Sequence, residues 1–326
     1  MGKFKNPYPN LNIDDYSHLY EIDSRFKCSK CERSRKFFCY TCSKFPDTDN
    51  KPPPKVKIPF EINIIKHKQE VDGKSTSSHA KILTEDQVEI FIYPNIPDYR
   101  KEIDDVVLIF VSPHAVDIKS LLEGQKKFKL KNNYGLARGE LMGTLLMKDL
   151  NEIKDEENDV KMLENGHEKK SLFLDKLPFK KAIFIDSTWK QCRSIFHDER
   201  LNSLTAVIIQ HRKTIFWRKQ KDVPDWFLST IEAIHQFLIE VHIQAWGIEK
   251  HYFDNCLQDF RYHNTDWIPK EKIIDSEMDI SEKRDKEKVP YNGQYDNILY
   301  FYSFFYSFIH SLDNPNAEFK SIKLVD

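Results

Sequence analysis

The sequence lacks any apolar run of the roughly 18 residues that a membrane-spanning helix requires. Its most hydrophobic stretch, residues 298–309, is interrupted by serines. The first residues, MGKFKNPYPN, also lack the apolar segment of a secretory signal. We therefore expect a soluble protein of the cell interior that has no membrane partner.

The sequence also has little net charge: 50 lysines and arginines are balanced by 51 aspartates and glutamates, which gives a formal charge of −1. Disorder of the whole chain is excluded by 23 Phe, 14 Tyr and 5 Trp residues, which could not all remain solvated. The charge is unevenly spread, however. Residues 25–44 contain seven basic side chains and one acid, and residues 211–221 contain five basic side chains and no acid. These clusters are consistent with binding of a polyanion and equally with surface solubility.

Four of the six cysteines form two closely spaced pairs, Cys28-x-x-Cys31 and Cys39-x-x-Cys42. Two such pairs can bring four thiolates around one tetrahedral zinc ion. Zinc is favoured over two disulfides because the cytosol and the nucleus keep thiols reduced. Cations and aromatic residues surround the pairs, which suits contact with RNA. The alternative is a structural zinc knuckle whose aromatic residues form its own core. The other two cysteines are expected to be small buried residues.

Apolar runs rich in β-branched residues predict buried strands at residues 88–93, 106–111, 182–186 and 206–210. Helical patterns lie between and after them, and the clearest begins near Ser229. This alternation predicts an α/β fold with a mainly parallel sheet and helices on both faces. A strongly aromatic run at residues 295–312 predicts a C-terminal helix packed on this body.

One predicted strand ends in a polar turn that is a candidate site. The apolar run of residues 180–186 ends at Asp186, and Ser187, Thr188 and Trp189 follow directly. Ligands of open α/β sheets gather at the carboxyl ends of strands, where helix N-termini offer free N–H groups. Asp186 is therefore placed to accept a hydrogen bond from a ligand or to act as a base. The alternative is that Asp186 or Ser187 only caps the next helix.

The combination of motifs resembles the DTW domain family. Residues 186–189, D-S-T-W, match the signature that names the family, and residues 229–233, S-T-I-E-A, resemble its Ser-Thr-x-Glu-Ala segment. The upstream four-cysteine module, the region of Arg218 and the order of these elements also agree. The resemblance covers about residues 25–250. Within the family, the chain is most similar to the eukaryotic tRNA-uridine aminocarboxypropyltransferases.

This resemblance implies a SPOUT-like, knotted α/β fold that binds S-adenosyl-L-methionine. Members transfer the 3-amino-3-carboxypropyl group to N3 of a uridine in the tRNA D-loop (giving acp3U) and release methylthioadenosine. In this branch the target is uridine 20 and the enzyme is nuclear. Nothing in the composition or periodicity predicts a knot, which physical reasoning alone would reject as too rare.

The resemblance and the chemistry of this reaction together suggest roles for the motif residues. The uridine N3 proton must leave as the nitrogen attacks, which requires a base. Asp186 would take that proton or orient the amino group of the donor. Thr188 would bind ligand or cap the helix, and Trp189 would stack on a base or pack behind the turn. The expected cofactor contacts are Ser187, Ser229, Thr230 and Glu232, although Ser229 and Glu232 also fit a capping box that needs no ligand.

The candidates for tRNA phosphate contacts are Arg212, Lys213, Arg218 and Lys219, with surface solubility as the alternative.

We expect an N-terminal extension (1–24), a four-cysteine zinc-binding module (25–45) and a Pro-rich linker (46–59). A SPOUT-like DTW catalytic domain follows at 60–268, with a charged insertion near 151–170. The last segment, 269–326, combines a charged linker with the C-terminal helix.

Two other functions are consistent with the same sequence features. An ordinary SPOUT-type RNA methyltransferase would use the same donor and fold but would release S-adenosylhomocysteine. A non-catalytic zinc-knuckle RNA-binding protein would keep the fold without turnover, although the intact motif residues argue against that.

Overall fold

The computed structural model describes residues 6–46, 51–124, 174–218, 224–275 and 289–311. The expected charged insertion near 151–170 lies outside these residues, and so does Lys219. Trp189 is described only as part of a helix, because its side chain also lies outside the described part.

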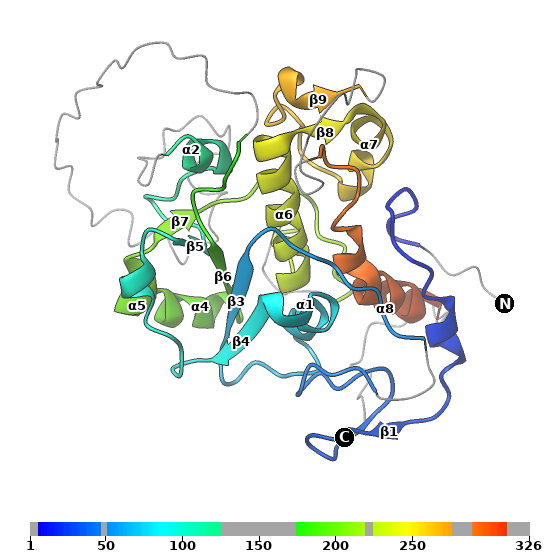
Figure 1. Cartoon of the computed structure of the whole chain (residues 1–326). Helices are drawn as coiled ribbons and strands as arrows, with labels where there is room; N and C mark the ends of the chain where they lie inside the picture. The colour runs from blue at the N-terminus through cyan, green and yellow to red at the C-terminus, as the bar shows by residue number, and fades with distance from the viewer. Residues whose placement is uncertain (1–5, 47–50, 125–173, 219–223, 276–288, 312–326) are drawn as a thin grey trace, which may run out of the picture.

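A five-stranded sheet lies at the centre of the molecule (Figure 1). Its strand order is β4–β3–β6–β5–β7, and every neighbouring pair is parallel. The strands are β3 (Glu61–Lys66), β4 (Val88–Ile92), β5 (Val106–Ile109), β6 (Lys181–Asp186) and β7 (Thr205–Val207). The prediction of a mainly parallel sheet is therefore confirmed. Strand β7 is shorter than its apolar run. Beyond Val207, the Ile208 N–H donates to the Val116 carbonyl at 3.0 Å, and the Gln210 N–H donates at 2.7 Å to Glu240 of helix α6 (Thr230–Trp246).

The sequence patterns do not predict β3, although this strand pairs with both β4 and β6. Its apolar run is short and is interrupted by Asn63, which weakens the signal of a buried strand. In the structure Asn63 is buried, and its side-chain amide donates to the Tyr99 hydroxyl at 3.0 Å. That bond lets a polar residue occupy a strand that is covered on both faces.

Helices cover both faces of the sheet, as expected (Figure 1). On one face, alternate strand residues such as Ile64 and Phe184 pack with α1 (Ser77–Leu83), α2 (Ile118–Leu122) and α6 (Thr230–Trp246). On the other face, Ile65 and Ile183 pack with α4 (Trp189–Phe196) and α5 (Glu199–Asn202). The alternation follows from the two-residue period of a β-strand.

Smaller elements complete the described part. Helix α6 ends at Gly247, whose φ of 85° is in the left-handed region that glycine adopts easily. Beyond it lie α7 (Lys250–Asn255) and a parallel pair of two-residue strands, β8 (Ile248–Glu249) and β9 (Ile273–Ile274). The 3₁₀ helices are η1 (Ser17–Glu21), η2 (Glu85–Gln87), η3 (Tyr99–Glu102), η4 (Leu257–Phe260), η5 (Lys270–Lys272) and η6 (Asp296–Leu299). None of the described helices is long and apolar enough to cross a membrane.

The predicted C-terminal helix is present as α8 (Tyr300–Ser311). It packs with Leu19 near the N-terminus and with Phe38 of the cysteine module in a third core cluster. The cysteine module also contains the short antiparallel strands β1 (Phe26–Lys27) and β2 (Ser34–Arg35). Figure 1 shows these N-terminal segments beside α8. The division into domains stays a prediction.

The segment expected to be a linker runs along the body. The Val56 N–H donates to the Leu83 carbonyl at 2.7 Å, and the Ile58 N–H donates to the Gln87 side chain at 2.9 Å. Val56 and Ile58 are both buried. Cys192 and Cys256 are buried too, which confirms the expectation for these two cysteines.

Candidate functional site

Asp186 is the last residue of β6 and pairs in register with Lys66, the last residue of β3. The chain leaves these two strands in opposite directions. After β3 it enters α1 on one face of the sheet, and after β6 it enters α4 on the other face. This is a topological switch point, the place where open α/β sheets form a crevice for ligands. The fold thus puts Asp186 where a ligand site is expected.

Two hydroxyl groups hold the Asp186 carboxylate. Thr230 Oγ1 donates to Oδ1 at 2.7 Å, and Ser75 Oγ donates to Oδ2 at 2.5 Å. Asp186 is only 6% exposed, so these bonds replace much of the water that the carboxylate would otherwise bind. Ser75 comes from the loop of residues 67–76 after β3, which we call the β3–α1 loop, and Thr230 is the first residue of α6. Both carboxylate oxygens are therefore fixed from two different elements.

The rest of the D-S-T-W motif begins helix α4. Thr188 is the N-cap residue and forms a capping box with Gln191, whose side-chain oxygen accepts the Thr188 N–H at 3.3 Å. Thr188 Oγ1 also donates to Gln191 at 2.8 Å. Gln191 in turn donates to Gln69 of the β3–α1 loop at 3.2 Å. The capping role considered for Thr188 is thus present, and it connects α4 to the neighbouring loop.

The S-T-I-E-A segment forms the start of α6, and the predicted capping box is confirmed. The Ser229 N–H donates to Glu232 Oε2 at 2.9 Å. Glu232 is fully buried and also accepts hydrogen bonds from the Thr214 hydroxyl at 2.7 Å and the Ile215 N–H at 3.1 Å. These partners give Glu232 a structural position behind the helix start. Thr230 is the residue of this segment that reaches Asp186.

The helix start offers fewer free N–H groups than the sequence suggests. The Ile231 N–H already donates to Thr76 Oγ1 at 3.1 Å. Thr76 is buried and directly follows Ser75, so the end of the β3–α1 loop both caps α6 and binds Asp186. A carboxylate of a ligand would therefore depend on side-chain donors as well as on the helix.

Arg218 and Glu70 add charge near Asp186. An Arg218 guanidinium nitrogen donates to the Gly73 carbonyl at 3.0 Å, which brings this side chain onto the β3–α1 loop. Burial lowers the pKa of Arg218, and the negative charge of Glu70 opposes that change. Burial raises the pKa of Glu70, and the negative charge of Asp186 raises it further. Glu70 thus interacts electrostatically both with Asp186 and with Arg218.

The basic residues proposed as phosphate contacts lie in different surroundings. Lys213 has a side chain that is 63% exposed, with Asp225 3.2 Å away. Arg212 is only 2% exposed, donates to the Glu232 carbonyl at 3.2 Å, and lies 4.7 Å from the centre of the Phe260 ring. The structure places Arg212 in the core, so we withdraw it as a tRNA contact. Its long side chain packs with aromatic residues although its charge suggests the surface.

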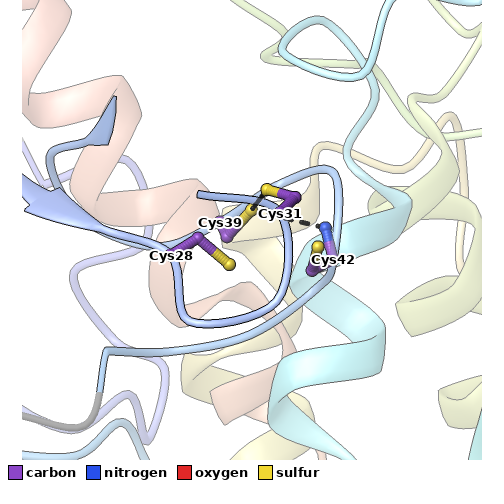
Figure 2. Close-up of side chains that lie close together, drawn as sticks. All are labelled: Cys28, Cys31, Cys39 and Cys42. Carbon is purple, nitrogen blue, oxygen red and sulfur yellow. Dashed lines mark hydrogen bonds between the residues drawn. The ribbon is translucent and has the colours of Figure 1, made fainter. Parts of the chain in front are cut away.

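The four cysteines of the two C-x-x-C pairs converge (Figure 2). Their sulfur atoms all lie within 4.8 Å of one another, and the Sγ atoms of Cys31 and Cys39 are 3.6 Å apart. A zinc ion with four Zn–S bonds of about 2.3 Å separates its ligands by about 3.8 Å. The Cys42 N–H donates to Cys39 Sγ at 3.4 Å, a bond that favours thiolate ligands. The donor set and its geometry fit a structural zinc ion.

Sequence reasoning did not find Ser75, Thr76 or Glu70. All three lie in the β3–α1 loop, which follows the unpredicted strand. The signal was nevertheless present, because a short apolar run ends at Lys66 and polar residues follow it, as they do after β6. The same rule that selected Asp186 applies to this strand end.

Comparison with known proteins identifies the family of the chain. The family model described as "DTW domain" matches residues 25–310. A human protein named tRNA-uridine aminocarboxypropyltransferase 1 is 39% identical over 317 residues, covering 94% of this chain and 84% of that protein. Proteins with the same name from Rattus norvegicus and Xenopus laevis are 36% and 35% identical, and cover 92% of this chain each, with 82% and 86% of their own lengths. No solved structure gives a significant match. The chain belongs to the DTW domain family.

Proposed function

We propose that this chain is a tRNA-uridine aminocarboxypropyltransferase. It transfers the 3-amino-3-carboxypropyl group from S-adenosyl-L-methionine to N3 of a uridine in the tRNA D-loop, at position 20. The names of the curated relatives support the reaction. The observation that carries the proposal is the bond between Thr230 of S-T-I-E-A and Asp186 of D-S-T-W, which joins the two family motifs at the switch point of the sheet.

The reaction forms one bond and breaks another. N3 of the uridine attacks the terminal carbon of the aminocarboxypropyl arm, and the bond between that carbon and sulfur breaks. Sulfur keeps the electron pair and leaves within methylthioadenosine. Because the sulfonium has three carbon arms, the site selects the product by aligning one arm with N3. Asp186, fixed at both oxygens, is suited to accept a hydrogen bond from the amino group of the donor and so to orient that arm.

The N3 proton needs an acceptor near the same edge of the sheet. Asp186 remains a candidate, and Glu70 is a second one. The pKa of Glu70 is raised by burial and by Asp186, which makes it a stronger base than an exposed glutamate. In this arrangement Arg218 would bind the carboxylate of the donor or a tRNA phosphate. Lys213 and Lys219 stay proposed phosphate contacts.

Three further points belong to the same proposal. The fold would be SPOUT-like and knotted. The four cysteines would bind one structural zinc ion, which would hold the module together. The protein would act in the nucleus.

Mass spectrometry of a reaction with purified protein, the donor and an unmodified tRNA transcript tests the proposal. We expect a uridine that gains the aminocarboxypropyl group, with methylthioadenosine released. Asp186→Asn should abolish the product while tRNA affinity stays nearly unchanged, because the amide keeps the shape but loses the charge. A methylated nucleoside with S-adenosylhomocysteine would replace the proposal by a methyltransferase. Tight tRNA binding without either product would support a non-catalytic RNA-binding protein.

A further inference from the structure

The four-cysteine module touches the β3–α1 loop directly. A Cβ atom built on Gly73 would lie 3.4 Å from Cζ of Tyr40 and 3.7 Å from its hydroxyl oxygen. The Tyr40 ring, which stands between the cysteine positions 39 and 42, therefore lies beside Gly73, at the distance where a side chain on residue 73 would be in van der Waals contact with it. Two residues after Gly73, the same loop donates the Ser75 hydroxyl to Asp186.

The Tyr40 ring is itself held in place. The Arg35 guanidinium lies 4.0 Å from the ring centre, at cation–π distance, and is buried. Arg35 also donates to Thr41 Oγ1 at 3.2 Å. The Thr41 hydroxyl lies near the Asp72 carboxylate, which pairs with Lys66 at the end of β3. The module thus approaches the loop at two adjacent residues, 72 and 73.

The cysteine module packs on helices α1 and α8 of the protein body. The Phe38 ring lies 4.7 Å from the Phe301 ring of α8 and 5.5 Å from the His79 ring of α1. Arg218 also donates to the Gly73 carbonyl of the β3–α1 loop. Gly73 thus has both Tyr40 and Arg218 as neighbours, an arrangement that we call the clamp.

We propose that Tyr40 is a positioning residue of the active site: it packs the cysteine module against residues 72–73 and so keeps Ser75 within hydrogen-bonding distance of Asp186. The expected effect of Tyr40 on kcat rests on the proposed function. Its expected effect on the position of the β3–α1 loop does not. The module then contributes to the transfer reaction by keeping Ser75 and Asp186 in place, in addition to any contact that it makes with RNA.

Amide hydrogen exchange of the β3–α1 loop tests the clamp without any substrate. We expect Tyr40→Ala to speed exchange in residues 67–76 by about tenfold or more, because the loop loses its packing partner. Tyr40→Phe keeps the ring and should exchange like the wild type. Lys30→Ala, an exposed change on the same module, is the control and should leave the loop unchanged. Zinc content, measured in parallel, establishes that each module is intact.

Kinetics then separate positioning from RNA contact. For Tyr40→Ala we expect kcat to fall about tenfold or more at saturating donor, with KM for tRNA nearly unchanged, and Tyr40→Phe should restore kcat. A rise in KM for tRNA alone would assign Tyr40 to RNA contact and overturn the proposal. Unchanged exchange in residues 67–76 would overturn it as well.

A second variant keeps the test decisive if Tyr40→Ala does not fold. Thr41→Val removes the hydroxyl that lies near Asp72 and accepts from Arg35, and it keeps the side-chain shape. It should loosen the same loop to a smaller extent, and wild-type exchange in that variant would contradict the clamp. If the wild-type protein proves to make no aminocarboxypropyl product, the proposed function fails, but the exchange experiment still decides whether Tyr40 holds the loop.

Discussion

Ser75 and Asp186 are 111 positions apart in the sequence, and the Ser75 hydroxyl donates to Asp186 Oδ2 at 2.5 Å. This bond joins the loop after β3 to the end of β6, the two strands that flank the switch point. It makes the β3–α1 loop part of the candidate active site. The loop therefore helps to fix the Asp186 carboxylate, together with Thr230 of α6.

Ser75→Ala should lower kcat/KM of the transfer by about 10- to 100-fold, because a hydrogen bond to a charged group is worth about 1.5–3 kcal/mol. Ser78→Ala is the control: Ser78 is a nearby serine that is buried, and its hydroxyl has no hydrogen-bond partner in the described part of the structure. Steady-state kinetics with a tRNA transcript make the comparison. Equal losses in the two variants would show that the bond to Asp186 has no catalytic role.

The cysteine cluster should bind one zinc ion per chain, as measured by elemental analysis of the purified protein. Cys31→Ser should lose most of this zinc and lower the thermal midpoint, because metal binding is coupled to folding of the module. Cys256→Ser changes a cysteine outside the cluster and should keep the metal. Full zinc content in Cys31→Ser would contradict a four-cysteine site.

Glu240 should make the protein less stable as the pH rises. It is buried in α6, and burial raises its pKa from 4.5 to about 8. Because the folded pKa is above the unfolded one, the folded state binds the additional proton between these values. The contribution of Glu240 to the free energy of unfolding is then largest below about pH 4.5 and falls, by at most about 1.4 kcal/mol per pH unit, until the pH passes 8.

Glu240→Gln should remove this contribution, since the amide oxygen can still accept from the Gln210 N–H and is never ionised. Urea unfolding between pH 5 and pH 8.5 measures the slope. Glu21→Gln, at an exposed position, should behave like the wild type. If Glu240→Gln keeps the wild-type slope, another group causes the pH dependence.

Arg212 and Lys213 are neighbours with opposite expected roles. Arg212→Met should lower the free energy of unfolding by about 2 kcal/mol or more, because it removes a buried hydrogen bond and a packed guanidinium. Lys213→Ala should leave stability nearly unchanged and reduce the salt slope of tRNA binding by about 1. Urea unfolding and tRNA titrations at several salt concentrations test both. A stable Arg212→Met protein with a reduced salt slope would return Arg212 to the RNA interface.

Local motifs were predictable because they depend on neighbouring residues. The cysteine spacing predicts that four sulfur atoms meet, and they do. The S-x-x-E pattern predicts a capping box, and Ser229 and Glu232 form it. The resemblance to the DTW domain family also rests on short motifs and is confirmed over residues 25–310. The residues that interact in the capping box are three positions apart, and the four cysteines lie within residues 28–42.

The sequence by itself thus determined the α/β class, the cysteine cluster, the helix starts and Asp186 as the centre of the candidate site. Only the tertiary structure decided which residues surround Asp186. Strand β3 was not predicted because a polar residue, Asn63, interrupts its apolar run, and the partner of Asn63, Tyr99, lies 36 positions away. Because this strand was missing from the prediction, the loop after it, which contains Ser75, could not be placed beside Asp186. The sequence predicted Arg212 to be a surface cation, because a charge pattern carries no information about the aromatic ring that packs against the side chain. Contacts between distant segments depend on how strands are ordered in the sheet, and a local pattern does not encode that order.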